Sequence, residues 1–224
     1  MQFLGVFFYI LSAVIGYLLG TIPMGVVIAR LYGGLDIRKT GSGNTGTTNV
    51  LRTLGWLPSI LTLVGDCLKG VLAAFVGKQL GGEIGMLLGG FCAVLGHDFP
   101  VFMHFRGGKG IATSLGVTII ICPPVAPWLV VICLAMVAVT RMMSVGSLTA
   151  SVSYPILFWI LTPESASFAL YMTFALVMAA LSFYCHRSNL MRLIRREENK
   201  LNFGKITEIS KKYMAMHKDR RKGK

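Results

Sequence analysis

Long apolar runs are the feature of this sequence that most restricts its fold. Runs of roughly 17–25 apolar residues are typical of helices that cross a lipid bilayer, because ~20 residues of helix span its hydrocarbon core. Only 14% of the 224 residues are charged, fewer than the surface of a soluble domain of this length requires. The sequence therefore predicts an all-α integral membrane protein. The long runs are 3–29, 56–78, 83–103, 125–140, 146–162 and 166–185, and a shorter one, 110–122, stops at two prolines.

The placement of positive charge indicates how often the chain crosses the membrane. If 110–122 is a seventh, short span, one side collects the loops 30–55 and 104–110, Arg141 and the tail from residue 186. That side then holds 20 of the 22 Lys and Arg residues, and positive charge concentrates in cytoplasmic loops. Six crossings give the same arrangement only if 110–122 is re-entrant. We expect a compact bundle of seven transmembrane helices, one of them short, with the N-terminus outside and the C-terminus in the cytoplasm.

Composition also limits the domain organisation and the classes of partner. The chain shows no internal repeat and no linker that would separate domains, so we predict a single domain over residues 1–224. Most of the net charge of +13 comes from the tail 186–224, which is typical of a cytoplasmic end that faces anionic lipid headgroups. The apolar N-terminus lacks the basic region and cleavage site of a signal peptide, so we expect it to be the first span. The five cysteines are scattered through apolar segments, and nothing in their spacing indicates a disulfide framework or a metal site.

The run 41–50, "GSGNTGTTNV", is polar and uncharged although the chain around it is apolar. Its letters match the Gly-x-Gly-x-x-Gly dinucleotide fingerprint, which requires a buried strand before it and an acidic residue about twenty positions later. Here "LDIRKT" precedes the run, and Asp66 lies within a predicted span. The run also nearly matches a P-loop, except that Thr47 stands in place of the lysine. We therefore reject both nucleotide-binding interpretations.

What remains of this first motif is a set of groups that suit an anion. Glycine backbones approach a ligand closely, and consecutive amides in such turns form anion-binding nests. Arg52 follows Asn49 by three residues and would face the same ligand on a helical turn. A flexible polar loop is the alternative, and we favour a phosphate or carboxylate pocket. Its expected binding residues are Gly41, Ser42, Gly43, Asn44, Gly46, Thr48 and Asn49.

A second motif holds Lys109 between glycines, in "RGGKG" at 106–110, directly before an apolar segment. A cation on a glycine turn at the start of a helix combines charge, free amides and the positive helix end, all of which favour an anion. Ordinary positive charge on a cytoplasmic loop would account for Arg106 but does not require the flanking glycines. We expect Gly107, Gly108, Lys109 and Gly110 to bind a phosphate group.

A third motif, "HRSNLMRLIRREENK", covers 186–200. His186 and Asn189 are three residues apart and would lie on one helical face. His186 would donate a hydrogen bond to a phosphate or act as a general acid or base. The solvated basic end of a final helix is an equally good interpretation of this segment.

Two charges lie inside a predicted span, Asp66 and Lys69 in "LTLVGDCLKGVLAAFVG". Each charge at mid-membrane costs roughly 2.5–3.5 kcal/mol on insertion scales, and their spacing of three residues makes mutual pairing natural. We expect this pair to have a structural role that supports the motif loops. His97 is expected to be a structural polar residue near the membrane interface.

The three motifs together resemble the signature segments of a known family. "GSGNTGTTNVLRTLG", "GHDFPVFMHFRGGKGIATSLGV" and "HRSNLMRLIRREENKL" are similar to those of the bacterial acyl-phosphate:glycerol-3-phosphate acyltransferases, the PlsY type. The likeness follows the same order over most of the chain. It implies a seven-span fold in the bacterial inner membrane, with its active site facing the cytoplasm. It also implies transfer of a fatty acyl group from acyl phosphate to the sn-1 hydroxyl of glycerol 3-phosphate, giving lysophosphatidic acid and phosphate for phospholipid synthesis.

The resemblance also assigns roles to residues and partners. Ser42 matches a serine that helps to hold the acyl phosphate, Arg52 and Lys109 match phosphate-binding basic positions, and His186 and Asn189 match the glycerol phosphate site. We expect these five to be catalytic. The family requires no metal or nucleotide cofactor. The implied partners are the two substrates, membrane lipids and other enzymes of phospholipid synthesis, but no nucleic acid.

Two other classes of protein remain as alternatives. A transporter of anions or phosphate compounds is disfavoured because carriers place their sites near the midplane of related halves, whereas these motifs share one face. A basic membrane scaffold would tolerate replacement of Ser42 and the glycines without loss of function.

Overall fold

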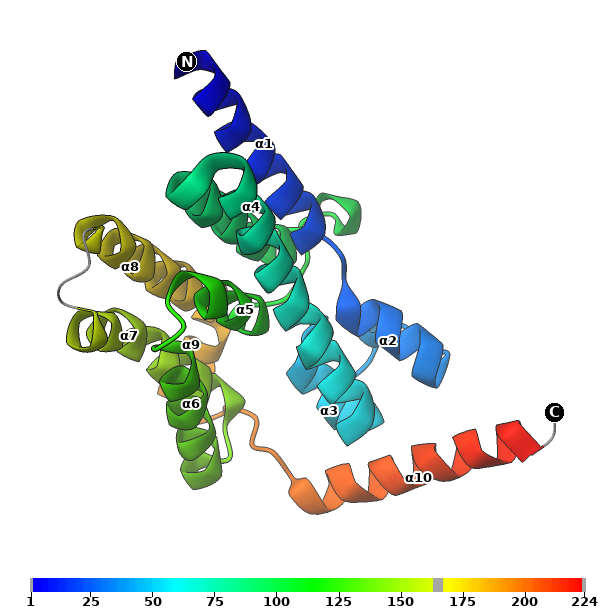
Figure 1. Ribbon diagram of the computed structural model, residues 1–224. Coiled ribbons are helices and arrows are strands. Elements are labelled where there is room, and N and C mark those ends of the chain that lie inside the picture. The colour runs from blue at the N-terminus through cyan, green and yellow to red at the C-terminus, as the bar shows by residue number, and fades with distance from the viewer. Residues whose placement is uncertain (1, 163–166, 223–224) are drawn as a thin grey trace. The chain divides into compact units, whose positions relative to one another are not determined.

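The computed structural model describes residues 2–162 and 167–222, and all regular structure in this part of the chain is helical. The all-α prediction is therefore confirmed over these residues. Figure 1 shows the elements in chain order, coloured from blue at the N-terminus to red at the C-terminus. They are α1 (Gln2–Gly20), α2 (Met24–Gly33), η1 (Ile37–Lys39), α3 (Thr47–Leu54), α4 (Trp56–Asp98), η2 (Val101–Met103), α5 (Ile111–Ile121), α6 (Ala126–Thr140), α7 (Met143–Leu161), α8 (Phe168–Cys185), α9 (Arg187–Ile194) and α10 (Phe203–Lys222).

The chain divides into two compact units, each built from two stretches of sequence. The larger unit combines the residues up to Ile22 with Cys67–Lys200. The smaller unit combines Pro23–Asp66 with the residues from Leu201 onward. Each is described separately below, and the single domain expected over 1–224 stays a prediction.

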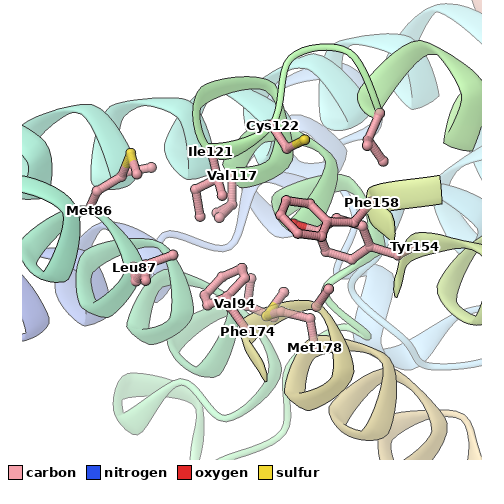
Figure 2. Close-up of a cluster of buried hydrophobic side chains, with 13 residues drawn as sticks. Met86, Leu87, Val94, Val117, Ile121, Cys122, Tyr154, Phe158, Phe174 and Met178 are labelled. Atoms are coloured by element: carbon pink, nitrogen blue, oxygen red, sulfur yellow. The ribbon is translucent and has the colours of Figure 1, made fainter. Parts of the chain in front are cut away.

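The core of the larger unit is a cluster of apolar side chains from α4, α5, α7 and α8 and the α5–α6 connection (Figure 2). Phe158 of α7 is buried in this cluster and packs against Phe168 and Tyr171 of α8. Small residues let other helices of the unit approach closely, since a Cβ on Gly16 would collide with the backbone of Gly89. The cluster comprises Ala74, Met86, Leu87, Val94, Val117, Ile121, Cys122, Val125, Tyr154, Phe158, Phe174, Ala175 and Met178.

Helix α4 is interrupted at Gly81 and Gly82, where the backbone leaves the helical region. Gly82 has φ 60° and ψ −144°, a conformation that only glycine adopts without strain. The two arms of α4 correspond to the predicted spans 56–78 and 83–103. The helix of the second arm stops at Asp98, and η2 follows at Val101–Met103, where the candidate membrane segment also ends. Pro100 disfavours helical backbone in the residue before it and has no N–H to continue the hydrogen-bond ladder.

The predicted first span, 3–29, was wrong as a single helix. It breaks after Gly20, and α2 begins at Met24. Pro23 lies directly before α2 and explains the break, since it restricts Ile22 and cannot donate a hydrogen bond to α1.

Four segments among the described residues are long and apolar enough to cross a bilayer: Phe3–Gly33, which contains this break, Trp56–Met103, Met143–Leu161 and Phe168–Cys185. Many large apolar side chains on these segments are exposed, as expected where lipid is the solvent. At 1.5 Å per residue, α5 is only ~16 Å long and α6 ~22 Å, shorter than the ~30 Å hydrocarbon core. Helices occupy all seven predicted ranges in the described part of the chain, but seven crossings and the orientation of the termini stay predictions. Residue 166, the predicted start of the last span, lies outside the described residues.

The second half of the predicted basic tail, from 186 onward, forms helix α10 in the smaller unit. The sequence predicted only its charge. Helix α10 packs against α3, and Leu201 and Ile206 are buried. The Trp56 N–H donates to Ser210 Oγ at 3.0 Å, and the Trp56 and Phe203 rings stack with centroids 6.2 Å apart. This helix therefore contributes apolar and polar contacts as well as charge.

Candidate functional site

The second motif forms a turn that follows the end of α4 in the larger unit. The N–H groups of Gly107 and Gly108 donate to the carbonyls of Asp98 and His97, at 3.1 and 3.0 Å. Gly110 has φ 69° and lies directly before α5, where a Cβ would meet Val94 and the Asp98 carboxylate. Lys109 is therefore presented from a turn with a defined backbone, at the start of a helix as predicted.

Lys109 of the second motif meets Asn189 of the third. The Lys109 ammonium donates to Asn189 Oδ1, and Asn189 Nδ2 donates to Glu198 Oε1 at 2.8 Å. Glu198 is only 9% exposed and also accepts a hydrogen bond from Arg192 Nε at 2.9 Å. Because a carboxylate only accepts, it orients the amide so that the Asn189 oxygen faces Lys109.

Glu198 is a residue of this site that the sequence analysis missed. It lies beyond the end of α9, nine residues after Asn189, so no helical spacing connects the two. The only signal was a rare carboxylate inside a basic segment.

His186 lies between α8 and α9 and is only 3% exposed. Its Nδ1 is 2.8 Å from the Ser182 carbonyl, which can only accept, so this nitrogen carries the proton. Burial, and then the positive charge of Lys109, lower the pKa of His186 to about 4. At neutral pH the ring is uncharged and its Nε2 can only accept a hydrogen bond. This geometry favours the general-base alternative for His186 over donation to a phosphate.

The third motif is not a solvated helix end. His186 and Asn189 are both buried, and the N–H of Asn189 donates to the His186 carbonyl at 2.8 Å, at the start of α9. The structure brings these two residues and Lys109 together in the larger unit.

The first motif belongs to the smaller unit and is organised by Asn49, whose side chain is 1% exposed. Asn49 Nδ2 donates to the carbonyls of Ile37, Thr40 and Asn44, at 3.1, 3.0 and 2.8 Å. Its Oδ1 accepts the N–H of Ser42 at 2.9 Å. The expected role of Asn49 as a ligand-binding amide is therefore not supported, because its amide is used to hold the turn.

The predicted nest of free amides needs the same correction. The N–H of Gly43 donates to the Thr40 carbonyl at 3.0 Å, and that of Gly46 donates to Asn44 Oδ1 at 2.8 Å. With Ser42, three of the amides expected to face an anion are thus bonded within the turn. Gly41 has φ 59°, and a Cβ there would collide with Asn49 Oδ1, so the structure of the turn by itself requires glycine at this position.

Other groups of the first motif remain accessible to a ligand. The Ser42 side chain is exposed, and Asn44, Thr48 and Arg52 are half-buried. Thr48 lies in the first turn of α3, and Arg52 lies one turn beyond Asn49 on the same helix, as predicted. The hydroxyl of Ser42 and the guanidinium of Arg52 are the strongest remaining candidates in this unit.

The two intramembrane charges are both buried on α4, Asp66 at 1% and Lys69 at 4% exposure. Lys69 Nζ donates to the carbonyls of Gly20 and Ile22, both at 2.9 Å, and to His97 Nδ1 at 2.7 Å. The sequence did not indicate these partners, and the predicted pairing with Asp66 stays a prediction. Within the described residues, no group of three or more His, Cys, Asp or Glu side chains could hold a metal ion.

Apolar helices of bilayer length, together with a half-buried lysine and a buried asparagine and neutral histidine, define a membrane protein with a site suited to an anionic ligand. The chain belongs to the glycerol-3-phosphate acyltransferase family, whose family model matches residues 10–196. A glycerol-3-phosphate acyltransferase of Thermoanaerobacter sp. (strain X514) is 40% identical over 200 residues, which are 89% of this chain and 98% of the relative. One of Thermus thermophilus is 43% identical over 191 residues, covering 85% of this chain and 94% of the relative.

Solved structures agree with this assignment. The crystal structure of PlsY, an integral membrane glycerol 3-phosphate acyltransferase, in its glycerol 3-phosphate form matches with a TM-score of 0.77 and 36% identity over 89% of this chain and 98% of that chain. Its lysophosphatidic acid form matches with a TM-score of 0.76 and 35% identity over the same shares. The predicted family is confirmed, and the chain is a multi-pass membrane protein of the acyltransferase class.

Proposed function

We propose that this protein transfers a fatty acyl group from acyl phosphate to the sn-1 hydroxyl of glycerol 3-phosphate. The products are lysophosphatidic acid and inorganic phosphate. Family membership supports the acceptor and the class of product, since related structures carry glycerol 3-phosphate and lysophosphatidic acid in their names. Acyl phosphate as the donor rests on the resemblance of the three motifs.

One observation carries the proposal, the meeting of Lys109, Asn189 and His186. Lys109 supplies a positive charge next to an oriented amide, and His186 adds a neutral imidazole beside that charge. A phosphate binds readily to an ammonium at the start of a helix. The imidazole nitrogen Nε2 accepts a hydrogen bond, which suits a hydroxyl of the acceptor.

The chemistry requires little from the protein because acyl phosphate is an activated mixed anhydride. The sn-1 oxygen attacks the acyl carbon, the bond between that carbon and the phosphate oxygen breaks, and the hydroxyl proton leaves with the phosphate or through His186. Holding two anionic substrates together and neutralising the charge that develops are then the main contributions. We assign Lys109 to phosphate binding, Asn189 to holding the Lys109 ammonium at the glycerol phosphate site, and His186 to the acceptor hydroxyl.

Ser42 and Arg52 are assigned to the acyl phosphate. Ser42 contributes an exposed hydroxyl. Arg52 contributes a guanidinium, which can bind one phosphate through two parallel N–H···O hydrogen bonds. Both assignments rest on the first motif.

For the membrane topology we propose seven crossings, with the N-terminus outside, the C-terminus in the cytoplasm and the active site facing the cytoplasm of the bacterial inner membrane. The concentration of 20 of 22 basic residues on one side supports this. Protease digestion of terminal tags in right-side-out and inverted vesicles measures the orientation. A C-terminal tag cleaved only in right-side-out vesicles would contradict it.

Purified protein mixed with acyl phosphate and labelled glycerol 3-phosphate tests the reaction. We expect release of inorganic phosphate and conversion of the label into an organic-soluble lipid at the same rate. Labelled glycerol 3-phosphate that enters proteoliposomes unchanged would instead indicate a transporter. Lys78→Ala is a matched control for Lys109→Ala, because Lys78 is an exposed lysine of the same unit.

A further inference from the structure

Lys69 lies in the interior of the larger unit, outside the three motifs in sequence but in contact with His97 of the second motif. A buried ammonium is unfavourable unless its N–H groups are all used. Those of Lys69 reach the carbonyls of Gly20 and Ile22 and the His97 ring. Carbonyls at the C-terminal end of a helix carry partial negative charge, so the end of α1 stabilises this cation.

The same contact determines the state of His97. An ammonium only donates, so the His97 Nδ1 that meets Lys69 must be the unprotonated nitrogen, and the ring proton lies on Nε2. The contact with Lys69, which lies 28 residues earlier in the chain, therefore fixes both the orientation and the tautomer of the His97 ring.

His97 in turn shapes the backbone that precedes Lys109. Its carbonyl accepts the Gly108 N–H at 3.0 Å, and its ring covers Gly108 so closely that a Cβ there would collide with Nε2. Gly107 has the same restriction, since a Cβ would meet the His97 carbonyl and Pro100. Both glycines of the turn are thus required because of the same histidine.

We infer that Lys69 is a positioning residue for the phosphate-binding turn: it holds His97, and His97 holds Gly107 and Gly108, which set the place of Lys109. In this arrangement Lys69 acts on Lys109 through His97, Gly107 and Gly108. The inference rests on the proposed function only in naming what Lys109 binds. It predicts that a buried lysine changes the affinity for glycerol 3-phosphate from a distance.

The test is a double-mutant cycle on purified protein with Lys69→Met, Gly108→Ala and the double variant. A displacement of about 1 Å costs on the order of 10²-fold in rate, so each single variant is expected to lose ~10²-fold in kcat/KM, mainly through a higher KM for glycerol 3-phosphate. The double variant should be little worse than either single one, because both changes break the same support. Losses that multiply to ~10⁴-fold would overturn the inference.

A second readout does not depend on the reaction. Hydrogen exchange of the peptide that contains Gly107 and Gly108 should rise in Lys69→Met, while α7 and α8 stay protected. Lys78→Met, at an exposed lysine of the same helix, should leave this exchange unchanged. If the wild-type protein were inactive but showed the expected exchange pattern, the proposed function would be contradicted and this inference would stand. If exchange were unchanged in Lys69→Met, this inference would be contradicted and the proposed function would stand.

Conservative variants cover the case in which Lys69→Met does not fold. His97→Asn keeps an acceptor oxygen near the Nδ1 position, whereas His97→Leu does not. We expect His97→Asn to retain most of the glycerol 3-phosphate affinity and His97→Leu to lose it. Equal KM values for the two variants would contradict the role of the Lys69 contact.

Discussion

The glycine-rich turns of the first and second motifs look alike in sequence but are held in different ways. In the smaller unit, the turn that begins at Gly41 is held from within, because Asn49 of the same motif bonds two backbone groups of the turn and two just before it. In the larger unit, the turn that ends at Gly110 is held from outside, by the end of α4, where His97 also meets Lys69. The first arrangement depends on one side chain nearby in sequence, and the second on contacts across the tertiary structure.

The largest expected effect comes from the cation that the second turn presents. Lys109→Ala removes a charged donor and should lower kcat/KM by ~10³-fold with little change in thermal stability. Phosphate release and thermal unfolding in detergent measure the two quantities, with Lys78→Ala as the control. A loss of kcat/KM below tenfold would contradict the role of the second turn in presenting the Lys109 charge to a substrate.

Asn49→Ala tests whether the first turn is held from within. Leaving several buried carbonyls without a donor should cost about 3 kcal/mol of unfolding free energy, or a fall in midpoint of ~6–12 °C. Asn44→Ala is the matched control, because it removes a single hydrogen bond to Gly46 and should cost ~1 kcal/mol. Equal midpoints for the two variants would contradict the central role of Asn49.

The titratable groups near the two turns should affect the stability of the protein in different pH ranges. His186, beside the second turn, has its pKa lowered to about 4, so the unfolded chain takes up a proton near pH ~6.5 that the folded protein does not. Its contribution to stability is therefore complete above pH ~6.5 and falls as the pH drops towards 4. His186→Asn should flatten the midpoint-versus-pH curve in that window, and an unchanged slope would contradict the burial of a neutral ring.

Asp36, before the first turn, supplies the control for this measurement. Hydrogen bonds from Arg38 hold the pKa of its carboxyl well below the usual range. The stability linked to this group is present above pH ~4 and is lost only below it. Asp36→Asn should therefore leave the curve unchanged between pH ~4.5 and ~6.5.

The smallest expected effect concerns outside support for the first motif. Ser210→Ala removes the acceptor of the Trp56 N–H where α3 passes into α4, and should cost ~1 kcal/mol, or ~2–4 °C in midpoint. Thr207→Ala, an exposed position on the same helix, should change nothing measurable. If Ser210→Ala were as destabilising as Asn49→Ala, the first turn would also depend on outside support.

Most helices could be predicted because their signal is local. An apolar run of bilayer length has no other stable conformation in lipid, since each backbone group must bond within its own segment. The break before α2 was missed although Pro23 marked it, because hydropathy continues across the proline. The docking of α10 was missed because two buried apolar residues, Leu201 and Ile206, are hidden in a strongly basic stretch.

The site was predictable in composition but not in its division of roles. An asparagine that binds a ligand and one that holds a turn look the same in sequence, and so the turn-holding contacts of Asn49 were not foreseen. Glu198 and the Lys69–His97 contact could not be found, because nothing local relates residues that lie nine or twenty-eight positions apart.

By itself the sequence determined that this chain is a helical membrane protein of one acyltransferase family, recognisable by three motifs that we predict to bind anions. Those properties depend on hydropathy, charge and residue type, which are set one residue at a time. The tertiary structure decided which amides are used up inside a turn, which proton His186 keeps and which residue orients Asn189. These depend on which groups meet at hydrogen-bonding distance in a buried place, where each donor must find an acceptor.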